Sequence, residues 1–388
     1  MKIYFKNAIF LLGVICLLLG LILYPEVSLK SAYNGLMAWF NVVLPSLFPF
    51  FIISELLIEI GFVNMLGNVL RPIIGPLFKV SGESAFPFAM SIISGYPVGA
   101  KITSSLREKK IISKTIGERT LSFSSTSGPL FMLGAVSIGI LGNGKIAPLI
   151  MYPHYLGAIT VGLAFNFYKS KEKPNHSNNK NNASIILYTL NKNYSIGSVL
   201  SKAMLKSINT ILLVGGFIIF YSVLTELIFI SDIFNKFLNY IPLSINIELL
   251  KGVIAGLLEV TTGIQRIASL NIELTYKLMI INFLIGWSGF SIHSQALSFI
   301  SKTDMDSKLY IFSKLLHGIF ASIYTGILYI FKYKEYIEPS FLPAPFYEYY
   351  FIGHWHIIFL NSLKIIILAI IYMIIVSVIL TIVYKITE

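Results

Sequence analysis

Apolar residues gather in runs of about 20 along the whole chain, each long enough to cross a hydrocarbon core of about 30 Å. The clearest runs predict membrane-spanning helices over residues 5–23, 35–60, 147–168, 208–230, 310–331 and 356–384. Residues 24–33 predict a short exposed connection, and residues 61–80 are typical of a helix at the membrane surface. Pro45 and Pro49 predict a bend in the second span, because proline removes a backbone hydrogen bond.

Two apolar segments are too short to cross the membrane. Residues 84–93 run into Gly95-Tyr96-Pro97, and residues 249–258 run into Glu259. A segment of about ten residues covers only half of a bilayer. Each segment therefore predicts one arm of a re-entrant hairpin whose tip lies inside the membrane.

Two longer apolar runs, residues 120–141 and 278–300, are interrupted by small and polar residues at 124–129 and 286–291. Non-helical backbone survives at membrane depth only where it is buried in protein or lines a wet cavity. Paired breaks of this kind are typical of the substrate sites of secondary transporters. Loops at the membrane surface are the alternative interpretation.

The two halves of the chain resemble each other in the order of these elements. Each half gives a span, a surface segment, a short hairpin, a broken span and a clean span, and His154 and His317 occupy matching places. We expect an internal repeat, inverted or parallel, with the substrate site between the halves. The predicted divisions are an N-terminal helix, a first transport repeat, a basic cytoplasmic linker, a second transport repeat, and an aromatic loop with a last helix, at residues 1–34, 35–168, 169–206, 207–331 and 332–388.

The predicted fold is thus an all-α polytopic membrane protein of about eight transmembrane helices and two re-entrant hairpins. Composition agrees with this class. Hydrophobic residues make up 55% of the chain, charged residues 12%, and mean hydropathy is +0.77. Soluble domains carry about 25% charged residues, so any site is expected in or at the membrane.

The net charge of +12 comes mainly from loops. Basic loops orient a membrane protein with those loops in the cytoplasm, and they favour anionic lipid or a small anionic substrate. No basic and aromatic nucleic-acid motif accompanies them. The single cysteine, Cys16, excludes an intramolecular disulfide and a cysteine-based metal site.

Helix ends and hairpin tips expose backbone N–H groups, which suit a carboxylate or phosphate. The substrate-binding candidates around the first break are Gly95, Tyr96, Gly99, Ser125, Thr126, Ser127 and Gly128. Those around the second break are Thr261, Thr262, Gly263, Gln265, Ser288, Gly289 and Ser291. The alternative for the hydroxyls is bonding back to helix carbonyls.

Charge at membrane depth is costly and marks functional candidates. Lys101 and Arg266 either attract an anion or reach the interface with their long side chains. Glu259 either carries a coupling proton or neutralises Arg266, and His293 is a second coupling candidate.

Four further ionisable residues are expected to have structural places. Glu118 and Glu226 lie near span ends and are expected at the membrane interface. His154 and His317 are expected to hydrogen-bond between helices. No nucleotide-binding loop or enzyme signature is present. A non-enzymatic function without metal or cofactor, coupled at most to Na⁺ or H⁺, is therefore expected.

The stretch from Ser94 to Lys101, with Gly117-Glu118-Arg119 and Ser127-Gly128-Pro129-Leu130-Phe131, resembles the sporulation integral membrane protein family known as YlbJ. The resemblance covers most of the chain and is densest over residues 44–142. Members carry a nucleoside-recognition gate region. The resemblance implies transport of dipicolinic acid from the mother cell across the outer forespore membrane, and a distant fold relation to concentrative nucleoside transporters.

Two alternatives stay open at this point. One is a transporter of nucleosides or other small anions. The other is a membrane scaffold for spore assembly without transport activity. Self-association and a second sporulation membrane protein are both open as partners.

Overall fold

The computed structural model describes residues 2–59, 62–169, 196–231, 234, 236, 246–333, 363, 367 and 371. Within these residues the regular structure is entirely helical. Gly144–Phe167, Ile196–Ile230 and Ser307–Phe331 are each long and apolar enough to cross a membrane, and a bent pair adds a fourth candidate. The predicted count of about eight spans stays a prediction, because the last predicted helix and most of the linker lie outside the described residues.

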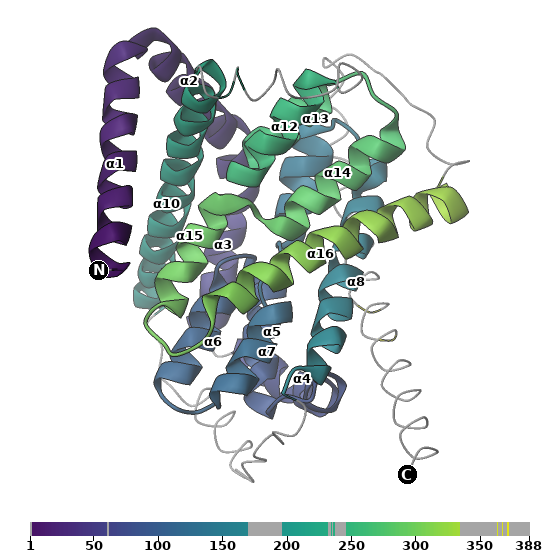
Figure 1. Cartoon of the computed structure of the whole chain (residues 1–388). Helices are drawn as coiled ribbons and strands as arrows, with labels where there is room; N and C mark the ends of the chain where they lie inside the picture. Colours follow the sequence, from purple (N-terminus) through teal and green to yellow (C-terminus); the bar gives the residue numbers. More distant parts are fainter. Residues whose placement is uncertain are drawn as a thin grey trace.

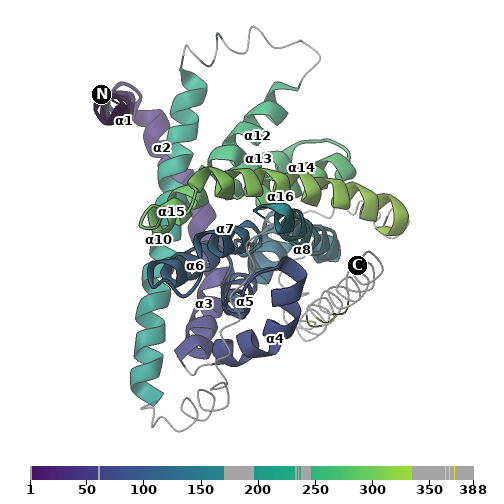
Figure 2. The same cartoon turned by 60° about the horizontal axis from the view of Figure 1, so that its bottom comes forward.

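The N-terminal part forms a bent arm against one long helix. The arm consists of α1 (Lys2–Leu23), α2 (Pro25–Ala38), the π-helical turn η1 (Trp39–Val43) and α3 (Leu44–Glu59). Most residues of the connection predicted at 24–33 are exposed as expected, but the segment is helical, because Pro25 starts α2 and proline suits the first helical position. Helix α10 (Ile196–Ile230) packs along α2 and α3 (Figure 2). It begins inside the predicted linker.

The first hairpin and the first break form as predicted. After α4 (Phe62–Phe78) and η2 (Gly82–Ser84), α5 (Ala85–Ser94) and α6 (Val98–Glu108) pack as a hairpin. Helix α7 (Lys114–Phe123) then ends, residues 124–128 are non-helical, and the chain continues into η3 (Phe131–Ile140). The short η4 (Gly144–Ile146), α8 (Ala147–Ala164) and η5 (Phe165–Phe167) complete this half.

The second half also contains a hairpin, a broken helix and a long helix. The hairpin is α12 (Ile247–Leu258) with α13 (Val260–Ser269), and the broken helix is α14 (Leu274–Trp287) with α15 (Gly289–Ile300). The break lies at Ser288, whose φ is +81°. Helix α16 (Ser307–Leu328) and η6 (Tyr329–Tyr333) follow.

The two hairpins reach the middle of the molecule from opposite ends (Figure 1). In that view α5 and α6 lie in the lower half, and α12 and α13 lie in the upper half. A continuous apolar core joins the halves, with Met132, Leu149, Ile264 and Leu284 all fully buried in it. Burial of this core holds the hairpin tips at one depth in the bundle.

Candidate functional site

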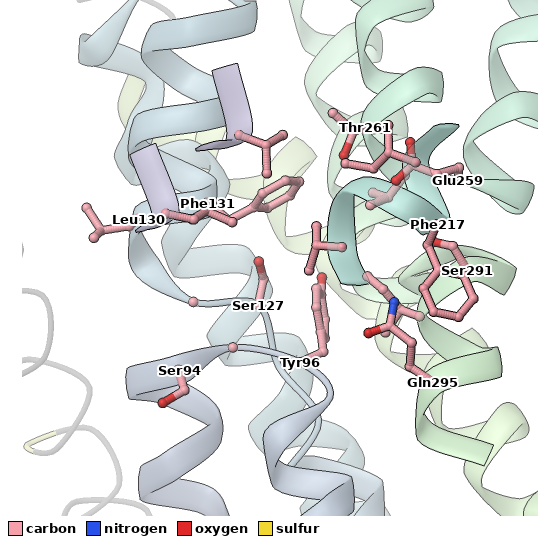
Figure 3. A pocket seen from close by; sticks show the side chains of 18 of the residues that line it. Ser94, Tyr96, Ser127, Leu130, Phe131, Phe217, Glu259, Thr261, Ser291 and Gln295 are labelled. Carbon is pink, nitrogen blue, oxygen red and sulfur yellow. The ribbon is translucent and has the colours of Figure 1, made fainter. Parts of the chain in front are cut away.

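A small cavity lies where the two hairpin tips meet the first break and the start of α15 (Figure 3). Its volume is about 70 Å³, several times the roughly 10–15 Å³ that one water molecule needs. Seven of the residues predicted from sequence line it, namely Gly95, Tyr96, Ser127, Gly128, Glu259, Thr261 and Ser291. Residues far apart in the chain therefore form one site.

One side of the cavity is apolar. Helices η1 and α3, the start of η3, and α10 supply its wall, which contains Val43, Leu47, Phe51, Leu130, Phe131, Val214, Phe217 and Ile218. The hairpin tips supply the polar side, and Ser94 and Gln295 belong to it although sequence reasoning missed them. An apolar wall facing a few polar groups is the usual character of a site for a small organic ligand.

Two hydroxyls at the cavity are buried without a hydrogen-bond partner in good geometry among the described residues. They belong to Ser94 and Ser127. Figure 3 shows the Ser127 hydroxyl pointing into the space between the tips. Buried polar groups are nearly always satisfied in folded proteins. The Ser127 hydroxyl therefore suits a ligand that brings its own hydrogen-bonding atoms, whereas the Ser94 hydroxyl points away from this space (Figure 3).

Glycines allow the first hairpin tip to lie directly on the first break. Gly95 has a φ of +71°, a conformation that favours glycine. A Cβ on Gly95 would lie 3.0 Å from the backbone nitrogen of Gly128. Both residues line the cavity, so a side chain at either would alter its floor.

The backbone donors expected at the first break are already occupied. The Thr126 N–H donates to Ser91 Oγ at 3.2 Å, and the Ser127 N–H donates to His154 Nε2 at 2.9 Å. The prediction that these N–H groups await a ligand is therefore wrong. Side chains from α5 and α8 hold the broken segment open instead.

Glu259 lies at the tip of the second hairpin and is buried. Its Oε2 accepts hydrogen bonds from the Thr262 N–H at 2.6 Å and the Thr262 hydroxyl at 2.9 Å. This carboxylate caps α13 at its N-terminus, where negative charge is favourable. The expected pairing with Arg266 is not formed, because Arg266 forms its salt bridge with Glu226.

Several predicted ligand residues instead shape the hairpins and turns. Gly99 and Gly263 permit close helix crossings, since a Cβ would clash with the Ser124 carbonyl oxygen in the first case and with Gly256 in the second. Ser288 and Gly289 make the turn between α14 and α15, both at positive φ.

Other predicted residues are engaged away from the cavity. The hydroxyls of Ser125 and Thr126 lie against Tyr310 and Ser91, respectively. The Lys101 side chain is exposed and its ammonium lies 6.0 Å from the Phe299 ring centroid. It therefore does not reach the site.

Thr262, Gln265 and Arg266 line a second, wider chamber of about 500 Å³ on the other side of α13. Asn34 and Asn41 of the N-terminal arm add to its polar lining. The Thr262 hydroxyl lies 3.1 Å from that of Ser222 on α10. The first turn of α13 thus separates the small cavity from the polar chamber. Glu226, expected at the membrane interface, lies in this chamber with Arg266.

His293 is buried beside the second break but does not line the cavity. Its ring packs 4.4 Å from the Trp287 ring and 5.6 Å from the Tyr310 ring, measured between centroids. Neither ring nitrogen has a hydrogen-bond partner in good geometry among the described residues. No group of three or more potential metal ligands occurs within the described residues.

Sequence reasoning missed Lys314, which is completely buried in α16. Its ammonium donates to the Ser125 carbonyl at 2.6 Å and lies 3.0 Å from His317 Nδ1. A charged residue inside an apolar span is a signal that the sequence offers, and Lys314 stands inside the predicted span at 310–331. Because it lies only one turn from the predicted start of that span, it resembles a residue at the membrane surface. His317 Nε2 lies 2.8 Å from the His154 carbonyl oxygen, which confirms the predicted contact between helices.

The Glu118-Arg119 pair anchors the base of the broken helix. Glu118 is buried, and it accepts hydrogen bonds from the Tyr168 hydroxyl and the Asp306 N–H, each at 3.0 Å. Arg119 donates to the carbonyls of Lys79, Tyr168 and Lys169. Glu118 can be buried because these two hydrogen bonds satisfy its carboxylate. Arg119 in turn satisfies carbonyl groups of neighbouring segments that would otherwise lack a partner.

Two comparisons with known proteins bear on this site. A family model described as Gate, nucleoside recognition, matches residues 40–147, which contain the first hairpin and the first break. The sporulation integral membrane protein YlbJ of Bacillus subtilis (strain 168) is 35% identical over 334 residues, covering 81% of each chain. No solved structure matches. With this identity over most of both chains, the protein belongs to the YlbJ family of sporulation integral membrane proteins.

Proposed function

We propose that this protein is a secondary transporter that moves dipicolinic acid, pyridine-2,6-dicarboxylate, from the mother cell across the outer forespore membrane. One observation carries the proposal. Two hairpin tips, the first helix break and the start of α15 just after the second break, drawn from separate halves of the chain, line a single cavity. Membership of a sporulation membrane protein family supports the biological setting.

The arrangement of the hairpins suits alternating access. They approach the cavity from opposite ends of the molecule (Figure 1), as in transporters built from inverted repeats. We infer that the halves are such a repeat and that each hairpin closes the route to one side of the membrane. At about 70 Å³ the cavity is smaller than the roughly 300 Å³ at which ligand pockets begin, so loading requires the tips to part.

The chemistry of the lining suits a planar aromatic acid. Phe51, Phe131 and Phe217 offer an apolar wall for a pyridine ring, and Ser127 offers a hydroxyl donor to its carboxylates. A dianion needs such donors because carboxylate oxygens accept several hydrogen bonds.

Glu259 gives this cavity a means of coupling. A carboxylate in the lining opposes an entering anion, since like charges repel strongly where water is scarce. Protonation of Glu259 removes that repulsion. We therefore propose that a proton accompanies dipicolinate, with His293 as the second candidate for carrying it and Na⁺ coupling as the alternative.

A strain that lacks the protein tests the biological role. Its spores are expected to contain little dipicolinate while still making it in the mother cell, and dipicolinate supplied externally should not restore normal content if the missing step is transport at this membrane. Normal spore dipicolinate in the deletion strain would contradict the proposal.

A nucleoside transporter is the second candidate, and the nucleoside-recognition family model favours it. Uptake of labelled nucleosides without dipicolinate flux would establish that alternative. A scaffold role predicts instead that Ser94→Ala/Ser127→Ala leaves spore dipicolinate normal while the variant still reaches the membrane.

A further inference from the structure

A fully buried cation stands at the junction of the two halves. Lys314 lies in α16, 0% exposed, and forms no salt bridge within the described part of the chain. Ionised groups at membrane depth are costly unless charge or strong hydrogen bonds compensate them. The surroundings of Lys314 therefore need an explanation.

Its protein partners supply lone pairs but no negative charge. The ammonium donates to the Ser125 carbonyl at 2.6 Å. His317 Nε2 faces the His154 carbonyl and must donate to it, so Nδ1 carries the lone pair that faces Lys314 at 3.0 Å. Both contacts favour the ammonium form of Lys314, and neither neutralises it.

This charge lies directly behind the polar side of the cavity. The Lys314 ammonium is 5.6 Å from the centroid of the Tyr96 ring, and Tyr96 lines the cavity. Its carbonyl partner, Ser125, belongs to the same broken segment as Ser127, whose hydroxyl points into the cavity. The field of the ammonium therefore reaches a bound ligand through a thin, water-poor layer.

The other basic residues near the breaks do not serve this purpose. Lys101 is exposed, and Arg266 is paired with Glu226. Lys277 is buried as well, but it donates to the Ala268 carbonyl at the end of α13, away from the cavity. Lys314 is thus the buried base best placed to act on an anion between the tips.

We propose that Lys314 is the specificity-determining residue of the site, and that a carboxylate of the transported anion is its counter-ion. This inference rests on the proposed transport of dipicolinate and adds the source of selectivity for charge. Lys314 acts on the ligand from behind Tyr96 and Ser127 rather than by forming part of the cavity wall. Glu259, the acid in the lining, opposes this attraction until it is protonated.

The test compares two ligands of nearly the same shape. Purified full-length protein is titrated calorimetrically with pyridine-2,6-dicarboxylate and with the neutral pyridine-2,6-dicarboxamide. Lys314→Met is expected to weaken dicarboxylate binding at least about tenfold, or about 1.4 kcal/mol. The same substitution should change diamide binding much less. Lys277→Met, the matched buried lysine, should leave the preference for the dicarboxylate unchanged.

If Lys314→Met weakens binding of both ligands equally, or of neither, the preference for the dicarboxylate is unchanged. That result would overturn the inference and leave Lys314 with a structural role alone. If Lys314→Met does not fold, Lys314→Gln keeps a donor toward the Ser125 carbonyl without the charge, and the same loss of preference is expected. Failure of the wild-type protein to bind the dicarboxylate would overturn the proposed function and this inference together. Wild-type binding with an unaltered preference in the variant would overturn the inference alone.

Discussion

The Tyr96 hydroxyl donates a hydrogen bond of 2.7 Å to the carbonyl oxygen of Ile285. Tyr96 is at the tip of the first hairpin, and Ile285 is in the last turn of α14, just before the second break. One bond thus joins the hairpin tip of the first half to the helix end beside the break of the second half. Opening the first hairpin would require this contact to break or to move with α14.

Tyr96→Phe is expected to loosen this link while keeping the aromatic ring in the cavity wall. Losing the donor leaves the Ile285 carbonyl with only the longer contact from the Ser288 hydroxyl at 3.5 Å, at a cost of about 1 kcal/mol. The melting temperature of the purified protein should fall, and transport should change with it. The control is Tyr276→Phe, because Tyr276 lies on α14, the helix of Ile285, and is 60% exposed. Equal melting temperatures for both variants would contradict the role given to the hydroxyl.

Gly95→Ala is expected to abolish transport. Alanine at a φ of +71° and a ψ of −168° costs about 1–3 kcal/mol, because this region is essentially restricted to glycine, and its Cβ would press on the Gly128 nitrogen at 3.0 Å. Spore dipicolinate content and membrane abundance are to be measured together. Gly216→Ala is the matched control, because a Cβ on Gly216 meets nothing within 4 Å. Normal transport by Gly95→Ala would show that the tip tolerates a shifted backbone.

Hydroxyls inside and outside the cavity are expected to behave in opposite ways. Ser127→Ala removes no good intramolecular hydrogen bond of its side chain, so stability should change little while affinity for dipicolinate falls. Ser91→Ala removes the bond to the Thr126 N–H and should lower stability by about 1 kcal/mol. Thermal unfolding and ligand titration of both variants separate the two roles. The reverse pattern would contradict the placement of the ligand.

Glu259→Gln is expected to uncouple transport from the proton gradient. The amide oxygen still accepts from the Thr262 N–H, so the cap of α13 is kept. Dipicolinate should still cross the membrane, but the flux should no longer respond to an imposed pH difference across proteoliposomes. A variant that responds as the wild type does would move the proton-carrying role to His293.

A pH effect on stability is expected at the loop between α15 and α16. Hydrogen bonds from Arg107, at 2.8 and 2.9 Å, hold the pKa of Asp304 below its ordinary value. The stabilisation is therefore complete above the ordinary aspartate pKa of about 3.9 and is lost as pH falls through the lower folded-state pKa. Asp304 is half exposed, so we expect less than about 1 kcal/mol.

Asp304→Asn tests this prediction, because the variant should lack the part of the stability that the wild type loses at acidic pH. Melting temperatures of the two proteins should differ at neutral pH and converge at strongly acidic pH. A constant difference at all pH values would mean that the ion pair does not account for it.

Local sequence was sufficient to predict the hairpins and the breaks, but not every helix boundary, since α2 begins at Pro25 and α10 at Ile196. The short apolar runs before Gly95 and Glu259, and the polar interruptions near Ser127 and Ser288, lie where the structure has tips and turns. These features depend on neighbouring residues, because proline, glycine and hydroxyl residues act on the backbone close to them.

Side-chain partners could not be predicted in the same way. Arg266 pairs with Glu226 on α10 rather than with Glu259 in its own hairpin, because helix rotation and packing decide which face meets which neighbour. Lys314 touches Ser125 from a helix that follows much later in the chain. Such contacts depend on how the halves dock, which no local pattern encodes.

Flux measured with purified protein tests the central claim most directly. The wild-type protein in proteoliposomes should take up labelled dipicolinate in a saturable manner, Ser94→Ala/Ser127→Ala should reduce this uptake, and labelled uridine should not accumulate. Uridine uptake without dipicolinate flux, or no flux of either by correctly folded protein, would contradict the account.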